Sequence, residues 1–320
     1  SGNFSDKVVG EAKLCPDQVT VKDRKGRNDL RNVFTLTIDP LDARDFDDAL
    51  SIRELKNDEW EIGVHIADVS HYVRQGTQLD REAKKRANST YLVGEVVPML
   101  PHRLSSGICS LVEAEERLVK SVLFRFSKEG KILGSKLAES VIKSDKRLTY
   151  EQAILFLEEK SMDTIRNAKP PPSRYSGNPG KALNELSNEL LCDLRDGIRT
   201  LWKIASRIRH SRMDAGSLDF ASSEVKILVD EKGEPEKILQ SESDESHQLI
   251  EEFMLLANET VAKELRKKKL PGIFRVHPDP DPENLEELRS FLSIFGISCG
   301  ELTSRKEVNK MLSQINKHPL

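Results

Sequence analysis

The chain has 320 residues, of which 37% are hydrophobic and 32% are charged, so it can form one large or two ordinary domains with a sizeable core. Its 50 Lys and Arg residues nearly balance its 53 Asp and Glu residues, giving a net charge of -3. This balance excludes a global basic field that would attract nucleic acid or an acidic membrane, so any site for a polyanion must be local.

The first half of the chain predicts β-hairpins. Apolar and polar residues alternate in "VFTLTIDP" (33–40), "ALSIRE" (49–54) and "WEIGVHI" (60–66), with a turn at residues 56–59. Two more hairpins are predicted around the turns "SKEGK" (127–131) and "DEKGE" (230–234).

The second half predicts helices. The proline-rich stretch 168–182 is typical of a loop or linker. After it, apolar residues repeat at helical spacing from Leu183 to Ile208, about seven turns. The basic residues at the end of this helix, Lys203 to Arg212, could stabilise the helix dipole or meet phosphates. Residues 246–269 predict another amphipathic helix, and further acidic helix starts follow from Pro282. The buried stripe of the helix at 246–269 is predicted to be Ile250, Phe253, Met254, Ala257 and Val261.

A dense acidic segment, "TIDPLDARDFDDAL" (37–50), lies between two predicted strands. It is not an EF-hand, which needs Gly at its sixth position and Glu at its twelfth. A start at Asp39 puts Arg44 and Leu50 there, and a start at Asp42 puts Asp47 and Arg53 there.

Two interpretations of this segment remain. It could be a solvated acidic loop, but apolar strand residues frame it, and Phe46 and Ala49 interleave with the acids. Carboxylates forced toward one spot tolerate each other when hard divalent cations lie among them, and Mg²⁺ binds through a few carboxylates, phosphate oxygens and water. One or two such ions can activate water and stabilise the leaving oxygen of a phosphodiester.

Several ordered motifs carry a resemblance to a known family. They are "TIDPLDARDFDDALSI", "GVHIADVSHYV", "TYLVGEVVPMLPHRLSSGICSL", "KRLTYEQA", "SLDF" and "LIEEFMLLAN". Together they resemble the catalytic (RNB) domain of the ribonuclease II / ribonuclease R family of 3′-to-5′ exoribonucleases. The segments "VVPMLP" and "GSLDF" favour the ribonuclease R-like branch.

The resemblance implies roles for individual residues. Asp39, Asp45, Asp47 and Asp48 match the family's four acidic positions; Asp39, Asp45 and Asp48 would hold Mg²⁺, and Asp47 would be the acid whose loss most damages cleavage. Asp42 has no counterpart and is expected at the surface. The substrate-binding residues implied are Tyr150, which packs against the terminal base, Tyr91, Phe220, which closes the stack of bases, and Glu251, with Glu252 as the less favoured neighbour. Stacking on aromatic rings accepts any base.

His65 and Asp68 suggest an acid/base pair, but the strand pattern turns His65 away from the face of Trp60 to Ile66, so we expect structural support near the site.

The chain also departs from the family. It contains no cold-shock-like or S1 RNA-binding module and no "SPIRRY"-type arginine motif, and we expect these in the full-length protein. The expectation is thus a partial RNB domain, residues 1–320, apparently truncated at its C-terminus. We expect a lead-in (1–30), a hairpin-rich part with the acidic loop (31–165), a proline-rich loop (166–182) and a helical part with one hairpin (183–320).

The predicted fold is α+β, with a mostly antiparallel sheet flanked by helices. The expected function is Mg²⁺-assisted hydrolysis of single-stranded RNA to nucleoside 5′-monophosphates. The alternative is a catalytically incomplete RNA-binding fragment. Four widely spaced cysteines suit reduced thiols in a cytoplasmic protein, and neither a signal peptide nor an apolar run of membrane-spanning length is apparent. These cysteines are Cys15, Cys109, Cys192 and Cys299.

Overall fold

A computed structural model describes residues 3–92, 95–158, 160–168, 180–218, 224–229, 235–241, 244–276 and 278–315. Two compact units form: Ser1–Ala205 with Ser223–Val261, and Ser206–Ser222 with Ala262–Leu320. The helices are α1 (Asp6–Leu14), α2 (Val21–Arg24), α3 (Val69–Tyr72), α4 (Gln78–Arg86), α5 (Tyr150–Leu157), α6 (Met162–Arg166), α7 (Asn188–Asp214), α8 (Glu245–Lys267), α9 (Pro282–Ile294) and α10 (Arg305–Ile315). Short helical turns cover Lys56–Asp58, Arg103–Ile108 and Leu183–Glu185.

The first unit is built on a seven-stranded sheet with the strand order β1-β8-β7-β4-β3-β2-β9. Its central pairs are antiparallel, and only the edge pairs β1–β8 and β2–β9 are parallel. The predicted mostly antiparallel sheet is confirmed. The strands are β1 (Asn28–Asp29), β2 (Thr35–Asp39), β3 (Asp48–Glu54), β4 (Trp60–Ala67), β7 (Glu116–Phe126), β8 (Ile132–Lys143) and β9 (Lys146–Thr149), with the separate pairs β5 (Thr90–Leu92) and β6 (Glu95–Val97), and β10 (Glu224–Val229) and β11 (Pro235–Ser241).

In the middle of this sheet, side chains on both faces are buried. All five residues of β2 are buried, including Thr35 and Thr37. Helix α7 covers one face. Gly197 lets this helix approach the sheet closely, since a Cβ at this position would lie only 2.8 Å from Cε1 of Phe34. The other face carries a core cluster that includes Phe46, Ala49, Ala67, Leu111 and Val119. Small polar side chains therefore lie inside because both faces are covered.

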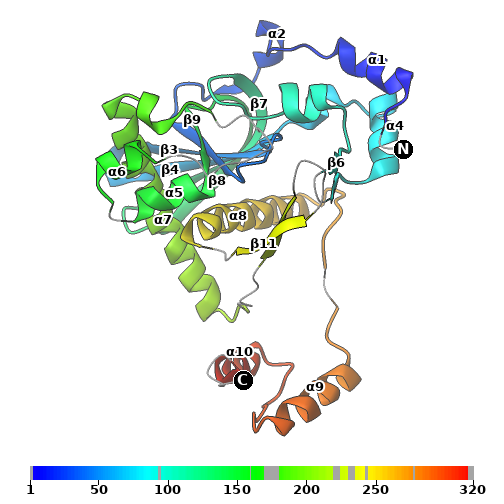
Figure 1. Cartoon of the computed structure of the whole chain (residues 1–320), viewed down its shortest axis with the longest axis vertical. Coiled ribbons are helices and arrows are strands. Elements are labelled where there is room, and N and C mark those ends of the chain that lie inside the picture. Colours follow the sequence, from blue (N-terminus) through cyan, green and yellow to red (C-terminus); the bar gives the residue numbers. More distant parts are fainter. Residues whose placement is uncertain are drawn as a thin grey trace. The chain divides into compact units, whose positions relative to one another are not determined.

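The short helices of the first unit lie at two ends of the sheet. Figure 1 shows α5 and α6 at one end of the first unit and α1 and α4 at the other. The predicted helix from Leu183 is wrong at its start, because α7 begins only at Asn188. Ser187 caps the start of α7, since its hydroxyl accepts a hydrogen bond from the backbone N–H of Leu190 at 3.2 Å.

Other predicted elements agree with the structure. The hairpins at β7–β8 and β10–β11 form, although the second turn, residues 230–234, lies outside the described residues, as does most of the proline-rich loop. In α8, Ile250, Phe253 and Ala257 are buried, and Met254 and Val261 are half-buried. In the second unit, α9 and α10 contribute to a small core of Leu292, Ile297, Leu302 and Met311.

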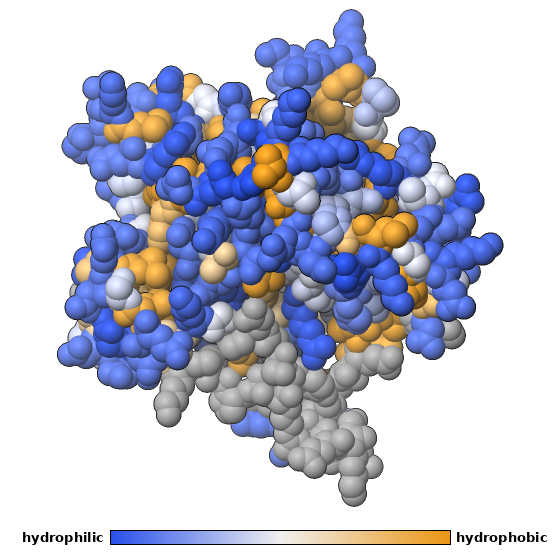
Figure 2. All heavy atoms as spheres, turned by 90° about the horizontal axis from the view of Figure 1, so that it is seen from above, coloured by the Kyte–Doolittle hydropathy of each residue, from blue (hydrophilic) through white to orange (hydrophobic). Residues whose placement is uncertain are grey.

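On the face drawn in Figure 2, hydrophilic side chains predominate and apolar ones form small separate groups. Within the described part of the chain, no helix has both the length and the apolar character needed to cross a membrane. All four cysteines carry free thiols.

Candidate active site

The acidic loop is anchored by its one large apolar residue. Phe46 is almost completely buried; its backbone N–H donates to Oγ of Ser110 at 3.0 Å, and its carbonyl accepts from the backbone N–H of Leu111 at 2.9 Å. Because the side chain of Phe46 points into the core, the side chains of its neighbours Asp45 and Asp47 point away from the core. The loop therefore holds these carboxylates toward solvent in a fixed frame.

Asp39 and Asp48 lie at the two ends of this loop. Asp39 ends β2 and Asp48 begins β3, the strand that pairs with β2. The Asp39 side chain is buried, and within the described residues its Oδ2 has no hydrogen-bond partner. Burial, together with the nearby charge of Asp48, raises the pKa of Asp39 to about 7. Burial and the neighbouring Asp47 raise the pKa of Asp48 to about 6. At neutral pH, ionising both Asp39 and Asp48 is therefore unfavourable unless a cation offsets their charge or one of them keeps its proton.

Asp45 and Asp47 occupy the outer part of the loop. Asp47 is exposed as a whole residue, but surrounding protein atoms partly desolvate its carboxylate. This desolvation, and to a lesser extent the charge of Asp45, raises the pKa of Asp47. The Tyr91 hydroxyl, from β5, donates a hydrogen bond to Oδ2 of Asp45 at 3.1 Å. Burial and the charge of Asp45 raise the pKa of Tyr91, so the hydroxyl keeps the proton that it donates. Asp42 is exposed, as expected.

Behind the acids lies Arg147, a residue that the sequence analysis did not single out. It belongs to β9, paired opposite Thr37 of β2, and its side chain is fully buried. Nη2 donates to the carbonyl of Pro40 at 2.6 Å, and the guanidinium lies 5.3 Å from the centre of the Phe46 ring. Its Nε and Nη1 lack hydrogen-bond partners within the described residues. Arg147 thus supplies a buried positive charge that lowers the pKa of Asp39 against the effect of burial.

Tyr150 is brought to the acids by strand pairing. Asp39 pairs with Thr149, the last residue of β9, and Tyr150 follows as the first residue of α5. Thr149 caps that helix, because its Oγ1 accepts from the backbone N–H of Gln152 at 3.1 Å. The Tyr150 ring stacks on His247 of α8, with centroids 3.8 Å apart and an angle of 10° between the planes.

Of the remaining predicted substrate-binding residues, Glu251 is exposed on α8, one turn beyond His247 and therefore on the same side of the helix. Its neighbour Glu252 is fully buried. Exposure thus favours Glu251 as the residue that can meet a ligand. Phe220 lies outside the described residues.

His65 and Asp68 do not form an acid/base pair. His65 is fully buried in β4, where Nδ1 lies 2.8 Å from Oγ of Ser121 and Nε2 lies 2.8 Å from Oγ of Ser51, on the two neighbouring strands. Burial lowers the pKa of His65 to about 3, so the ring is neutral. Asp68 instead binds Nη2 of Arg27 at 2.7 Å. Both residues hold the scaffold together.

The donor set suits Mg²⁺ in a particular way. No three acidic, histidine or cysteine side chains in the described ranges converge as a ready-made metal cage. However, Mg²⁺ is usually held by one or two carboxylates, with water and substrate phosphate completing its six ligands. The buried, unpartnered Oδ2 of Asp39 beside Asp48 fits this arrangement.

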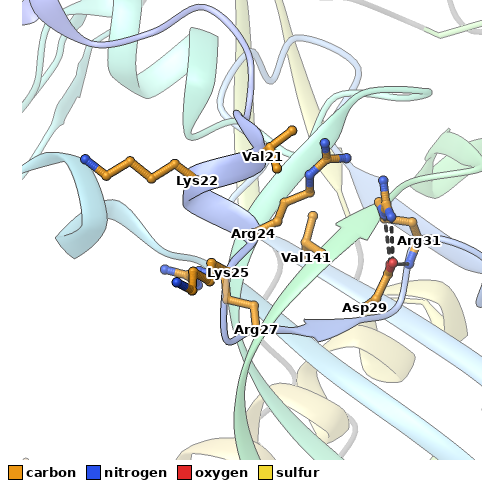
Figure 3. Close-up of a pocket in the computed structure, with 8 residues that line it drawn as sticks. All are labelled: Val21, Lys22, Arg24, Lys25, Arg27, Asp29, Arg31 and Val141. Carbon is orange, nitrogen blue, oxygen red and sulfur yellow. Dashed lines mark hydrogen bonds and ion pairs between the residues drawn. The ribbon is translucent and has the colours of Figure 1, made fainter.

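A cavity lies at the other edge of the sheet, against α2 and β1. This cavity of about 730 Å³ is lined by basic side chains that include Lys22, Arg24, Lys25, Arg27 and Arg31 (Figure 3). Its arginines already have carboxylate partners: Arg24 and Arg31 both bind Glu116, Arg31 also binds Asp29, and Arg27 binds Asp68. These pairs neutralise the three arginines, and the acidic site remains the stronger candidate.

Comparison with known proteins identifies the family of this chain. The RNB domain family matches residues 27–320, and the chain belongs to that family. It is 40% identical to Ribonuclease R of Thermotoga maritima over 100% of this chain and 42% of that protein, and 34% identical to Ribonuclease R of Escherichia coli over 98% of this chain and 35% of that protein. The structure of Mycoplasma genitalium RNase R in complex with ribose methylated single-stranded RNA matches 99% of this chain and 46% of that chain, with a TM-score of 0.84 and 28% identity. The chain thus spans less than half the length of these relatives.

Proposed function

We propose that this chain carries the hydrolytic site of a 3′-to-5′ exoribonuclease that uses Mg²⁺ to release nucleoside 5′-monophosphates from single-stranded RNA. The observation that carries the proposal is the Asp39–Asp48 pair, whose pKa values are raised by burial and by the charge of a neighbouring aspartate, Asp48 for Asp39 and Asp47 for Asp48; a divalent cation would offset these charges. The names of the relatives and the RNA in the Mycoplasma genitalium complex support the same substrate class.

Each acid has a part in this proposal. Asp39, Asp45 and Asp48 would hold Mg²⁺, which would activate water and stabilise the leaving oxygen of the phosphodiester. Asp47, which is exposed, is free to meet the reacting phosphate and its water. Tyr91 fixes Asp45 through its hydrogen bond, and Arg147 holds the loop through the carbonyl of Pro40.

The 3′-terminal base would lie against Tyr150. Tyr150 directly follows Thr149, the residue that pairs with Asp39. A base stacked on the Tyr150 ring would therefore bring the last phosphate of the RNA toward the aspartates. Stacking on a ring is worth about 1–3 kcal/mol per base and does not select sequence. Glu251 would contact the terminal nucleotide from α8, and Phe220 would close the stack of bases.

The test compares the wild-type chain with Asp47→Asn on 5′-labelled single-stranded RNA, in Mg²⁺ and in EDTA. We expect a ladder of shortening products only for the wild type in Mg²⁺, with the rate of Asp47→Asn lower by about 10³-fold or more and its RNA affinity retained. Asp42→Asn, an exposed acid of the same loop, is the matched control and should keep the wild-type rate. Equal hydrolysis by Asp47→Asn would reject the assignment.

A second candidate is a catalytically incomplete RNA-binding fragment, because no "SPIRRY"-type arginine motif occurs in the sequence and no three-ligand metal cage stands ready among the described residues. In that case wild-type chain would bind RNA in Mg²⁺ without releasing mononucleotides. Under either candidate we propose that cold-shock-like and S1 modules of the full-length protein deliver the RNA, since this chain has a net charge of only -3.

A further inference from the structure

The stack of Tyr150 on His247 is the most closely defined contact beside the acids that the proposed function does not use. Its centroid distance of 3.8 Å and interplanar angle of 10° mean that the imidazole lies flat on one face of the tyrosine ring. The contact joins the first turn of α5 to the first turn of α8, two helices separated by almost a hundred residues of chain that Figure 1 shows near each other.

Asp244 holds the side chain of His247 in place. Its Nδ1 lies 2.7 Å from Oδ1 of Asp244, and because a carboxylate only accepts, Nδ1 carries the proton of this hydrogen bond. The same Oδ1 also accepts from the backbone N–H groups of Ser246 and His247, at 2.9 and 3.2 Å. Asp244 is thus fixed as the cap of α8, and the imidazole that it binds has a defined position rather than a free rotamer.

A second contact ties the two helix starts together. The hydroxyl of Ser246, a fully buried residue, lies 2.5 Å from Oδ1 of Asp244 and 3.2 Å from the main-chain carbonyl oxygen of Tyr150. Both the backbone and the ring of Tyr150 therefore touch the same turn of α8. These two contacts fix the position of Tyr150 relative to the first turn of α8.

We propose that His247 is a positioning residue: by stacking on the Tyr150 ring, it fixes the orientation of the ring against which the 3′-terminal base of the RNA is proposed to lie. This inference rests on the proposed role of Tyr150. Fixing a ring before the base arrives reduces the conformational entropy lost on binding. The imidazole itself does not touch the reacting phosphate.

The test uses single-stranded RNA that ends in 2-aminopurine, whose fluorescence falls when the base stacks, with the chain in EDTA so that no turnover occurs. His247→Phe keeps a ring and loses the bond to Asp244, whereas His247→Gln keeps a polar head and loses the ring. We expect near wild-type affinity and quenching for His247→Phe, and an affinity about five- to tenfold weaker for His247→Gln, a part of the full stacking effect. His102→Gln, at an exposed histidine whose Nδ1 lies 3.3 Å from Oγ of Ser106, is the control and should bind as the wild type does.

A double-mutant cycle separates positioning from general damage. If His247 acts through Tyr150, His247→Gln should weaken binding no further in a Tyr150→Ala background. Additive losses, unchanged quenching in His247→Gln, equal losses in His247→Phe and His247→Gln, or a wild-type chain that does not quench the probe would each overturn the inference. Because these measurements need no hydrolysis, a wild type that binds and quenches but releases no mononucleotide in Mg²⁺ would reject the proposed activity while supporting the role of His247.

Discussion

Replacing Asp39 with Asn should stabilise the metal-free chain, and by more at high pH than at low pH. The ordinary pKa of an aspartate in an unfolded chain is about 3.9, whereas burial and Asp48 raise the folded value to about 7. The folded state thus holds its proton to higher pH than the unfolded state. The stability that this proton contributes is complete below about pH 4 and is lost as the pH rises through about 7.

The size of the effect follows from these two pKa values. At 1.36 kcal/mol per pKa unit, the raised pKa of Asp39 destabilises the folded state relative to the unfolded state by about 1.5 kcal/mol at pH 5 and about 4 kcal/mol at pH 8. Asn cannot ionise, so the benefit of Asp39→Asn should be about 2.5 kcal/mol larger at pH 8 than at pH 5. Any packing cost of the amide is the same at both pH values and cancels in this difference.

The assay is urea unfolding in EDTA at the two pH values, for the wild type, Asp39→Asn and the control Asp42→Asn. The exposed Asp42 should show little change between them. The reasoning would be refuted if Asp39→Asn gave the same change in unfolding free energy at pH 5 and pH 8, because Asp39 would then not be held in a repulsive, buried setting.

Three further predictions concern the same framework. Mg²⁺ should raise the unfolding midpoint of the wild type at pH 8 and have much less effect on Asp39→Asn; equal shifts in a thermal scan would place the ion elsewhere. Arg147→Met should destabilise the chain by about 3 kcal/mol, more at pH 8 than at pH 5, because it removes the buried charge near Asp39; urea unfolding that gives no loss would contradict this. Gly63→Ala should lower stability by about 2 kcal/mol, because its Cβ would lie 2.5 Å from both Nε2 of His65 and Oγ of Ser51; unchanged urea unfolding would show that the His65 bridge yields freely.

Local patterns predicted much of the fold. Alternation located the central strands β2, β3 and β4, and the acids fell at strand ends as expected, because these features depend on residues close in sequence. The parallel pairing of β2 with β9 was not predictable in this way, since it joins Leu36 to Lys146 across more than a hundred residues. That pairing is what brings Tyr150 beside Asp39.

The site shows the same division. The four aspartates were identified from their spacing and from the family resemblance, but Arg147 and His247 carry no local signal that separates them from ordinary charged or polar residues. Arg147 matters because it is buried behind Asp39, and His247 because its ring lies on Tyr150. Burial on both sides of a sheet and contacts between distant helices are tertiary properties, which a pattern along one segment does not contain.

The most direct test of the proposed activity follows the two ends of one RNA. Single-stranded RNA labelled at its 3′ end should yield labelled nucleoside 5′-monophosphate at the earliest times in Mg²⁺, whereas the same RNA labelled at its 5′ end should yield a ladder that shortens one nucleotide at a time. Internal fragments from both labels, or a mononucleotide first released from the 5′ label, would contradict the account.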